Sequence, residues 1–246
     1  MSLITWSPIL GQNSAHCFVQ EKFAKCCATG GSHISKVTKA QQLLNIALEM
    51  NAVGINQGTS GNVSVRKASG YLITPSGIPY DECAAKDMVG MTFKGQSSGS
   101  RKPSSEWRFH QDIYRCRKDV KAIVHVHSTF ATTIACLGRD LPSFHYMVAA
   151  AGGKTIRCAE YHTFGTQELS EAVIDAMQDR KACLMANHGM LATGSTLKKA
   201  LAMAVEVENL CEVYWRLLPL GGGNMVDDAE MDVILEKFKS YGQFTE

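Results

Sequence analysis

The sequence predicts a single α/β domain. Short apolar runs typical of buried strands alternate along the chain with segments in which apolar residues have helical spacing. The length of 246 residues is sufficient for one sizeable core, and the chain contains no internal repeat. Residues 1–36 carry no sustained period, so we expect a poorly ordered N-terminal extension there and one domain over residues 37–246.

The composition argues against several classes of protein. A formal net charge of +2 gives no reason to expect a nucleic acid or an acidic membrane surface as partner. No apolar stretch is long enough to span a bilayer, and residues 1–10 lack the Lys, Arg and apolar core of a secretory signal. The nine cysteines are odd in number and never spaced Cys-x-x-Cys, as in proteins of a reducing compartment. We therefore expect a cytoplasmic protein.

The first half of the domain is expected to contain one helix followed by short strands. Apolar residues from Leu43 to Met50 recur at helical spacing, and Gly54 supplies a stop signal. Residues 63–65 and 71–73 have the composition of strands, and each run lies next to a turn. The other elements expected here are a helical turn within residues 84–90 and a strand at residues 91–93.

The second half opens with a clear helix start. Ser104 and Ser105 precede Glu106 and a helix-period run, so the serines are candidate caps and the carboxylate complements the helix dipole. Residues 120–127 form the apolar central strand, and Thr166 is expected to cap a later helix. The other elements expected here are helices at residues 129–137, 169–177, 196–218 and 228–241, and strands at residues 155–159 and 182–186.

The central strand ends with two histidines, His125 and His127. Side chains two apart on a strand point to the same face, so the two imidazoles form half of a metal site unless they are merely hydrogen-bonded. A third histidine, His188, follows the strand at residues 182–186, and Glu106 lies at the helix start. Three histidines and one carboxylate make a credible zinc set that can release one position for a substrate.

Three turns rich in serine, threonine and glycine are candidate phosphate sites. They lie at residues 59–62, 74–77 and 104–105. Backbone amides in such turns and at helix starts can bind an anion, although the first turn taken alone is more often just a turn, and the serines at 104–105 can cap a helix and bind phosphate at once. A metal site beside a phosphate cradle predicts a small phosphorylated substrate.

Several long motifs resemble the class II aldolase/adducin family, and most closely its L-fuculose-1-phosphate aldolase branch. The motifs lie at residues 58–66, 72–80, 103–110 and 145–153, and the similarity runs from about residue 39 to residue 242. The resemblance implies a single α/β catalytic domain around a mixed, mainly antiparallel central sheet flanked by helices. It also implies a homotetramer with active sites between subunits.

The resemblance further implies which residues form the active site. One zinc ion per subunit would be held by Glu106, His125, His127 and His188. The substrate phosphate would be held by Asn62, Ser76, Gly77, Ser104 and Ser105, with Thr59 and Gly61 shaping the first turn.

The implied reaction is reversible cleavage of L-fuculose 1-phosphate, or a related ketose 1-phosphate, to dihydroxyacetone phosphate and L-lactaldehyde. Glu106 would leave zinc when substrate chelates and would move the proton at the carbon beside the ketone. Tyr146, from a neighbouring subunit, would exchange a proton with the aldehyde-derived oxygen, and Tyr241 would close over the aldehyde end. Alternatively, Tyr146 is a plain interface aromatic and Tyr241 serves only in packing; His110 and His145 are expected to be structural.

Two departures from the fuculose-phosphate branch bear on specificity. Val126 stands where that branch carries asparagine, and Asn187 stands where it carries histidine. Rival functions are an L-ribulose-5-phosphate 4-epimerase, which would carry Asp at Glu106, and a methylthioribulose-1-phosphate dehydratase. A rival of another class is an adducin-like interaction module that kept the fold and lost catalysis.

Overall fold

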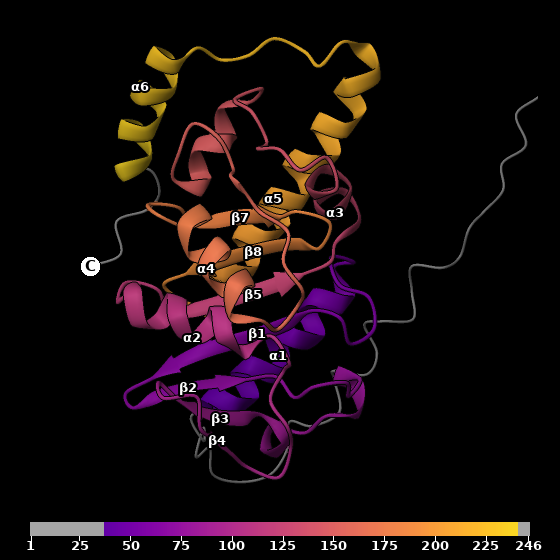
Figure 1. The fold of residues 1–246 in the computed structure, drawn as a ribbon, viewed down its shortest axis with the longest axis vertical. Coiled ribbons are helices and arrows are strands. Elements are labelled where there is room, and N and C mark those ends of the chain that lie inside the picture. The colour runs from indigo at the N-terminus through magenta and orange to yellow at the C-terminus, as the bar shows by residue number, and fades with distance from the viewer. Residues whose placement is uncertain (1–36, 241–246) are drawn as a thin grey trace, which may run out of the picture. The chain divides into compact units, whose positions relative to one another are not determined.

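The computed structural model describes residues 37–240, and these form one mixed sheet flanked by helices (Figure 1). In this part of the chain the strand order is β4-β3-β2-β1-β5-β8-β7-β6, with every neighbouring pair antiparallel except β6 and β7. The expected mixed, mainly antiparallel sheet is therefore confirmed. The strands are β1 (Asn62–Lys67), β2 (Gly70–Ile73), β3 (Val89–Thr92), β4 (Ser97–Ser98), β5 (Ala122–Val126), β6 (Cys158–Ala159), β7 (Ala182–Met185) and β8 (Gly189–Gly194).

Helices cover both faces of the sheet. Helices α2 and α4 lie on the face turned toward the viewer in Figure 1, and α1 and α5 lie behind it. The α-helices are α1 (Lys39–Ala52), α2 (Trp107–Cys116), α3 (Thr129–Ala135), α4 (Gln167–Ala176), α5 (Leu197–Leu217) and α6 (Asp228–Lys239). Short 3-10 helices are η1 (Tyr80–Glu82), η2 (Ala85–Asp87), η3 (Tyr146–Ala151) and η4 (Leu218–Leu220).

Strand β5 lies at the centre of the sheet and is buried along its whole length. Its side chains alternate between two hydrophobic cores, as the period of two requires. Val124 and Val126 pack with α1, α3 and α5, whereas Ile123 packs with α2 and α4. His125 faces the same side as Ile123, where its ring meets Phe109 of α2 at 5.4 Å.

Most of the predicted helices and strands are confirmed, but two strands were missed and the start of one helix was placed at the wrong residue. Strand β8 is buried between β5 and β7 without polar alternation, and β4 has only two residues, so neither gave a period-two signal. The strand expected at residues 155–159 is reduced to β6. Helix α2 has Glu106 rather than a serine at its N-cap position, whereas Thr166 caps α4 as predicted.

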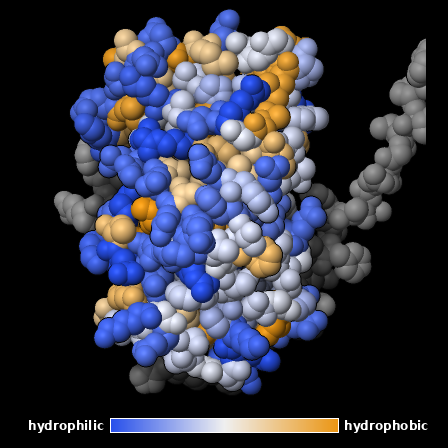
Figure 2. Space-filling view, viewed as in Figure 1, coloured by the Kyte–Doolittle hydropathy of each residue, from blue (hydrophilic) through white to orange (hydrophobic). Residues whose placement is uncertain are grey.

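The remaining domain predictions concern the chain ends and the surface. The extension at residues 1–36 and the residue Tyr241 lie outside the described residues. None of the helices within residues 37–240 is long and apolar enough to cross a membrane. Most side chains on the face shown in Figure 2 are hydrophilic, with hydrophobic residues scattered among them.

Candidate metal centre

Four predicted metal ligands converge at one end of β5. His125 lies in β5, His127 just after it, His188 in the turn from β7 to β8, and Glu106 directly before α2. Their ligand atoms all lie within 4.8 Å of one another. The three imidazole rings have centroids 4.8 to 5.0 Å apart and stand nearly perpendicular to one another. The structure thus brings together side chains that are separated by up to 82 positions in the sequence (188 − 106).

The turn between β7 and β8 places His188 against the end of β5. Asn187 adopts a left-handed backbone conformation with φ 54°, which asparagine tolerates better than most residues. A Cβ on Gly189 would lie 2.5 Å from the carbonyl oxygen of Val126 and 3.0 Å from the ring of His127. Only glycine therefore allows this turn to approach β5 so closely.

Hydrogen bonds orient the ligand atoms toward a common point. His125 Nδ1 donates to the carbonyl oxygen of Met190 at 2.8 Å, which leaves Nε2 facing the cluster. His125 Nε2 lies 2.9 Å from His127 Nε2 and 3.1 Å from Glu106 Oε2. Glu106 Oε1 is buried without a hydrogen-bond partner among the described residues and lies 3.0 Å from His188 Nε2. This orphaned oxygen and the facing imidazole nitrogens fit a divalent metal ion held by three histidines and one carboxylate.

The electrostatics of the cluster favour the ligand forms of Glu106 and His127 but not that of His125. Burial raises the pKa of Glu106, but His125 and His188 outweigh this effect and hold it well below its usual range, so the carboxylate is ionised. Burial lowers the pKa of His127 to about 4, so this imidazole is neutral at pH 7. For His125, burial lowers the pKa, but the Glu106 carboxylate more than compensates and raises it. Metal binding needs an ionised carboxylate and neutral imidazoles, so a bound cation would shift His125 toward its neutral form.

The first predicted phosphate turn lies beside the cluster. Asn62 pairs with His125 across β1 and β5, is 2 % exposed, and donates from Nδ2 to Glu106 Oε2 at 2.9 Å. Gly61 accepts a hydrogen bond from the hydroxyl of Tyr80, and a Cβ on it would lie 2.7 Å from the carbonyl oxygen of His125. Thr59 is exposed. The structure therefore gives Asn62 a carboxylate partner that its sequence motif did not predict.

The second and third phosphate turns are joined to each other. Pro75 and Pro103 form an isolated bridge, and the Ser76 amide donates to the Lys102 carbonyl oxygen. The Ser104 amide in turn donates to the carbonyl oxygen of Thr74, at the start of the second turn. Ser76, Gly77 and Ser105 are exposed, and Ser104 is buried. The exposed residues of the two turns are thus held next to each other just before Glu106.

Tyr146, one of the two predicted catalytic tyrosines, is not in the cluster. Tyr146 begins η3 and is 52 % exposed, with its ring against His145. His145 caps η3 by accepting a hydrogen bond from the Met147 amide, as its expected structural role requires. Tyr241 lies outside the described range, so its assignment stays a prediction.

Sequence reasoning assigned no role to the segment before α4. Arg108 of α2 donates to the Gly165 carbonyl oxygen at 2.6 Å, and a Cβ on Gly165 would lie 2.8 Å from the Ser105 carbonyl oxygen. The neighbouring Phe164 is 65 % exposed, and Tyr161 is 60 % exposed. Gly165 therefore lies next to the third turn, and the exposed ring of Phe164 precedes it in the chain. The signal in the sequence was the pair Phe164-Gly165 directly before the Thr166 cap.

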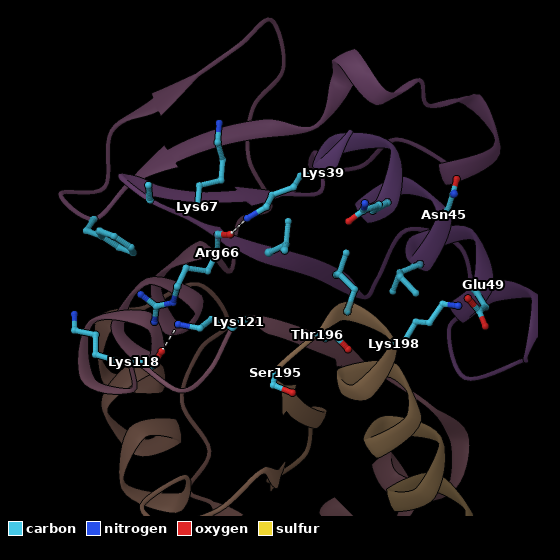
Figure 3. A pocket seen from close by; sticks show the side chains of 16 residues that line it. Lys39, Asn45, Glu49, Arg66, Lys67, Lys118, Lys121, Ser195, Thr196 and Lys198 are labelled. Atoms are coloured by element: carbon cyan, nitrogen blue, oxygen red, sulfur yellow. Dashed lines mark hydrogen bonds between the residues drawn. The ribbon is translucent and has the colours of Figure 1, made fainter. Parts of the chain in front are cut away.

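A separate basic cavity of about 1060 Å³ lies toward the other end of β1 and β5 (Figure 3). Asn62 pairs with His125 at the metal-centre end, whereas the Arg66 amide bonds to Lys121 at the cavity. At about 3.3 Å per residue, four residues of β1 separate the ends by about 13 Å. The Arg66 guanidinium is already bonded to three backbone carbonyl groups. Because the two ends of β1 are this far apart, the cavity is not part of the metal centre.

The fold and the cluster define the class of protein: an α/β domain with a candidate metal centre of three histidines and one glutamate. Residues 41–215 match the family model described as Class II Aldolase and Adducin N-terminal domain. That match covers more than half of the chain, so the chain belongs to the class II aldolase/adducin family, as its motifs predicted.

Close relatives carry aldolase names. The chain is 51% identical over 208 residues to the 5-methylthioribulose-1-phosphate/5-deoxyribulose-1-phosphate aldolase of Rhodospirillum rubrum, covering 85% of this chain and 94% of that protein. It is 47% identical over 204 residues to the L-fuculose phosphate aldolase of Escherichia coli K12, covering 82% and 95%. A solved L-fuculose 1-phosphate aldolase matches with a TM-score of 0.80 and 40% identity, covering 85% of this chain and 100% of that chain. These relatives support a lyase activity.

Proposed function

We propose that this protein is a zinc-dependent aldolase that cleaves a ketose 1-phosphate to dihydroxyacetone phosphate and a short aldehyde. The observation that carries the proposal is the convergence of Glu106, His125, His127 and His188 beside three hydroxyl-rich turns. Histidine nitrogens and a carboxylate oxygen are ligands that suit zinc, although they also suit other divalent ions. Retention of all four ligands favours an enzyme over a non-catalytic interaction module.

The chemistry needs a stabilised negative charge and a proton carrier beside it. When bound, a zinc ion supplies Lewis-acid stabilisation of the charge that develops on the ketone oxygen as the carbon–carbon bond breaks. Glu106 is ionised and buried at the site, so its carboxylate is placed to remove the proton at the carbon next to the ketone in the condensation direction and, once it carries that proton, to return it in the cleavage direction. In the cleavage direction this carbon gains one proton from Glu106, and the substrate hydroxyl group loses one proton to a second group, so the two steps balance.

The hydroxyl-rich turns suit the phosphate end of the substrate. We assign the phosphate to Asn62, Ser76, Gly77, Ser104 and Ser105, with the first turn shaped by Thr59 and Gly61. Exposed hydroxyl groups and amides of joined turns can donate several hydrogen bonds to one phosphate. Asn62 Nδ2 already donates one hydrogen bond to Glu106. An amide nitrogen carries two hydrogens, so the second one would contact the substrate between the phosphate and the metal.

The aldehyde end would be completed by a second subunit. Tyr146 is half exposed in the single chain, which suits a side chain that reaches a neighbour's active site. There its hydroxyl group would exchange a proton with the aldehyde-derived oxygen, and Tyr241 would cover the same end. A cyclic homotetramer is the assembly we propose, and light scattering after size-exclusion chromatography measures it directly.

Three ketose 1-phosphates are candidate substrates, and they differ in the aldehyde that they release. L-Fuculose 1-phosphate gives lactaldehyde, and 5-deoxyribulose 1-phosphate gives acetaldehyde or, with a methylthio group, its methylthio derivative. The second and third candidates are favoured by the higher identity to the Rhodospirillum rubrum relative.

The two departures from the fuculose-phosphate branch act differently on specificity. Val126 is fully buried in the core with α3 and α5, so any effect on the aldehyde is indirect. Asn187 is exposed next to His188, so it is the position more able to contact a substrate.

A substrate panel tests the proposal. The zinc-loaded protein is assayed for dihydroxyacetone phosphate release from L-fuculose 1-phosphate, 5-deoxyribulose 1-phosphate and its 5-methylthio derivative, with kcat/KM measured for each. Release from at least one supports the proposal, and the highest value identifies the aldehyde. No release from any of them, with 4-epimerisation of L-ribulose 5-phosphate instead, would overturn it.

A further inference from the structure

A chain of four hydrogen bonds runs from the Glu106 carboxylate into the protein core. Asn62 Nδ2 donates to Glu106 Oε2, and Asn62 Oδ1 lies 2.5 Å from His110 Nε2. His110 Nδ1 lies 2.7 Å from Ser64 Oγ, which lies 2.8 Å from the hydroxyl group of Tyr114. All five side chains belong to residues that are at most 5 % exposed. The chain connects β1 with α2.

The direction of every hydrogen bond follows from the ionised carboxylate. Glu106 can only accept, so Asn62 must turn its NH₂ group toward it and its Oδ1 toward His110. His110 Nε2 must then donate, and because burial lowers the pKa of His110 to about 3, the neutral ring accepts at Nδ1 from Ser64. Ser64 accepts in turn from Tyr114. All the donors therefore point toward the metal centre.

His110 is the residue that fixes the orientation of the Asn62 amide. If the amide flipped, Oδ1 would face the Glu106 carboxylate and two acceptors would repel each other. The His110 ring is itself held by Phe109, which stacks on it at 4.8 Å, and by Ser64. Buried networks of this kind restrict their members to one arrangement when every donor and acceptor is satisfied.

We propose that His110 is a positioning residue that acts through Asn62 to hold the Glu106 carboxylate in the orientation that binds the metal ion and reaches the substrate. This inference rests on the function proposed above, because it gives the carboxylate its task. It changes the role expected for His110 from a structural one to one that supports the site. Partners that orient metal ligands in this way are typically worth about ten- to hundred-fold in affinity or activity.

Three variants of His110 separate its hydrogen bond from its packing. His110→Phe keeps a ring but removes the donor, and His110→Asn is polar but too short to reach Asn62. His110→Gln can still donate to Asn62 Oδ1. We expect kcat to fall about ten- to hundred-fold in the Phe and Asn variants and to recover in the Gln variant, with KM changed much less. Ile113→Val, a buried change on the same helix, is the packing control and is expected to keep kcat.

Two further measurements make the test decisive. With Co²⁺ in place of zinc, the visible spectrum is expected to change in His110→Phe and to match wild type in His110→Gln, because Glu106 is displaced only in the former. The double variant Asn62→Ala, His110→Phe is expected to be no slower than Asn62→Ala alone. A wild-type Co²⁺ spectrum and kcat in His110→Phe, or multiplicative losses in the double variant, would overturn the inference. A wild-type protein without aldolase activity would instead overturn the proposed function, and the Co²⁺ spectra would still test His110.

Discussion

Glu208 of α5 accepts a 2.6 Å hydrogen bond from the hydroxyl group of Ser128, the residue that follows the metal-site histidine His127. The same carboxylate accepts hydrogen bonds from the backbone amides of Phe130 and Ala131, at 2.9 and 2.8 Å. Helix α3 is therefore capped by a side chain from another helix, and its own N-cap serine makes no side-chain cap. A negative charge at this position also complements the helix dipole. The long helix α5 thus fixes the chain where it leaves the metal centre.

Replacing Glu208 with alanine is expected to weaken both the fold and the site. Loss of a charged cap with three hydrogen bonds should lower the free energy of unfolding by about 2–3 kcal/mol. Zinc affinity should fall about tenfold, because His127 is less firmly held. Urea unfolding and a zinc-chelator competition measure the two effects. The control is Glu212→Ala on the same helix, which removes only an i,i+4 pair with the exposed Arg216 and should cost less than about 0.5 kcal/mol. Equal behaviour of the two variants would contradict the capping role.

The left-handed residue Asn187 gives a second prediction. Alanine tolerates a left-handed backbone with φ 54° less well than asparagine, so Asn187→Ala should lower the free energy of unfolding by about 1 kcal/mol. Asn187→Gly should be nearly neutral, because glycine adopts this conformation readily. Asp179 has φ 55° in a different turn, so Asp179→Ala is a matched control for the backbone strain. Both alanine variants should be destabilised in urea, but only Asn187→Ala should lose zinc affinity, because the turn carries His188. Unchanged zinc affinity in Asn187→Ala would contradict the role of this turn in placing His188.

The proton-transfer role of Glu106 predicts the effect of a nearly isosteric change. Glu106→Gln should keep the fold and depress the exchange of the carbon-bound proton of dihydroxyacetone phosphate by at least about 100-fold. NMR in deuterated water follows this exchange without the aldehyde. Zinc content is measured in parallel, so that loss of the metal is distinguished from loss of the base. Exchange at the wild-type rate would remove Glu106 from the proposed role.

The buried His110 predicts how stability depends on pH. Its pKa is about 3 in the folded protein and close to 6.5 when unfolded, so the unfolded state binds the extra proton between these values. The contribution of the neutral ring to stability is therefore complete above pH 6.5 and is lost as the pH falls from 6.5 toward 3. In urea unfolding at pH 4 to 6 without metal, His110→Phe should show a slope of stability against pH smaller by up to about 1.4 kcal/mol per unit. Identical slopes would mean that the ring is already charged in the native state.

Local patterns predicted a large part of the fold and the four candidate metal ligands. The period of two placed His125 and His127 on one face of β5, a second strand end supplied His188, and a helix start supplied Glu106. Strand β8 was missed because a fully buried strand has no polar alternation to reveal it.

The supporting residues could not be predicted, because their partners are distant in sequence. His110 lies 48 residues from Asn62, and Glu208 lies 80 residues from Ser128. Each is a polar residue on a helix, which local rules assign to a solvent-facing or structural role. Only the packing of α2 against β1, and of α5 against the start of α3, gives these side chains partners at the metal centre.

The most direct measurement is the release of dihydroxyacetone phosphate from the preferred ketose 1-phosphate by metal-stripped and zinc-restored protein, compared with a His188→Ala variant. We expect no release from the stripped protein, recovery on addition of about one equivalent of zinc, and no recovery in the variant. Undiminished release by stripped protein, or full recovery by His188→Ala, would contradict a catalytic metal held by Glu106, His125, His127 and His188.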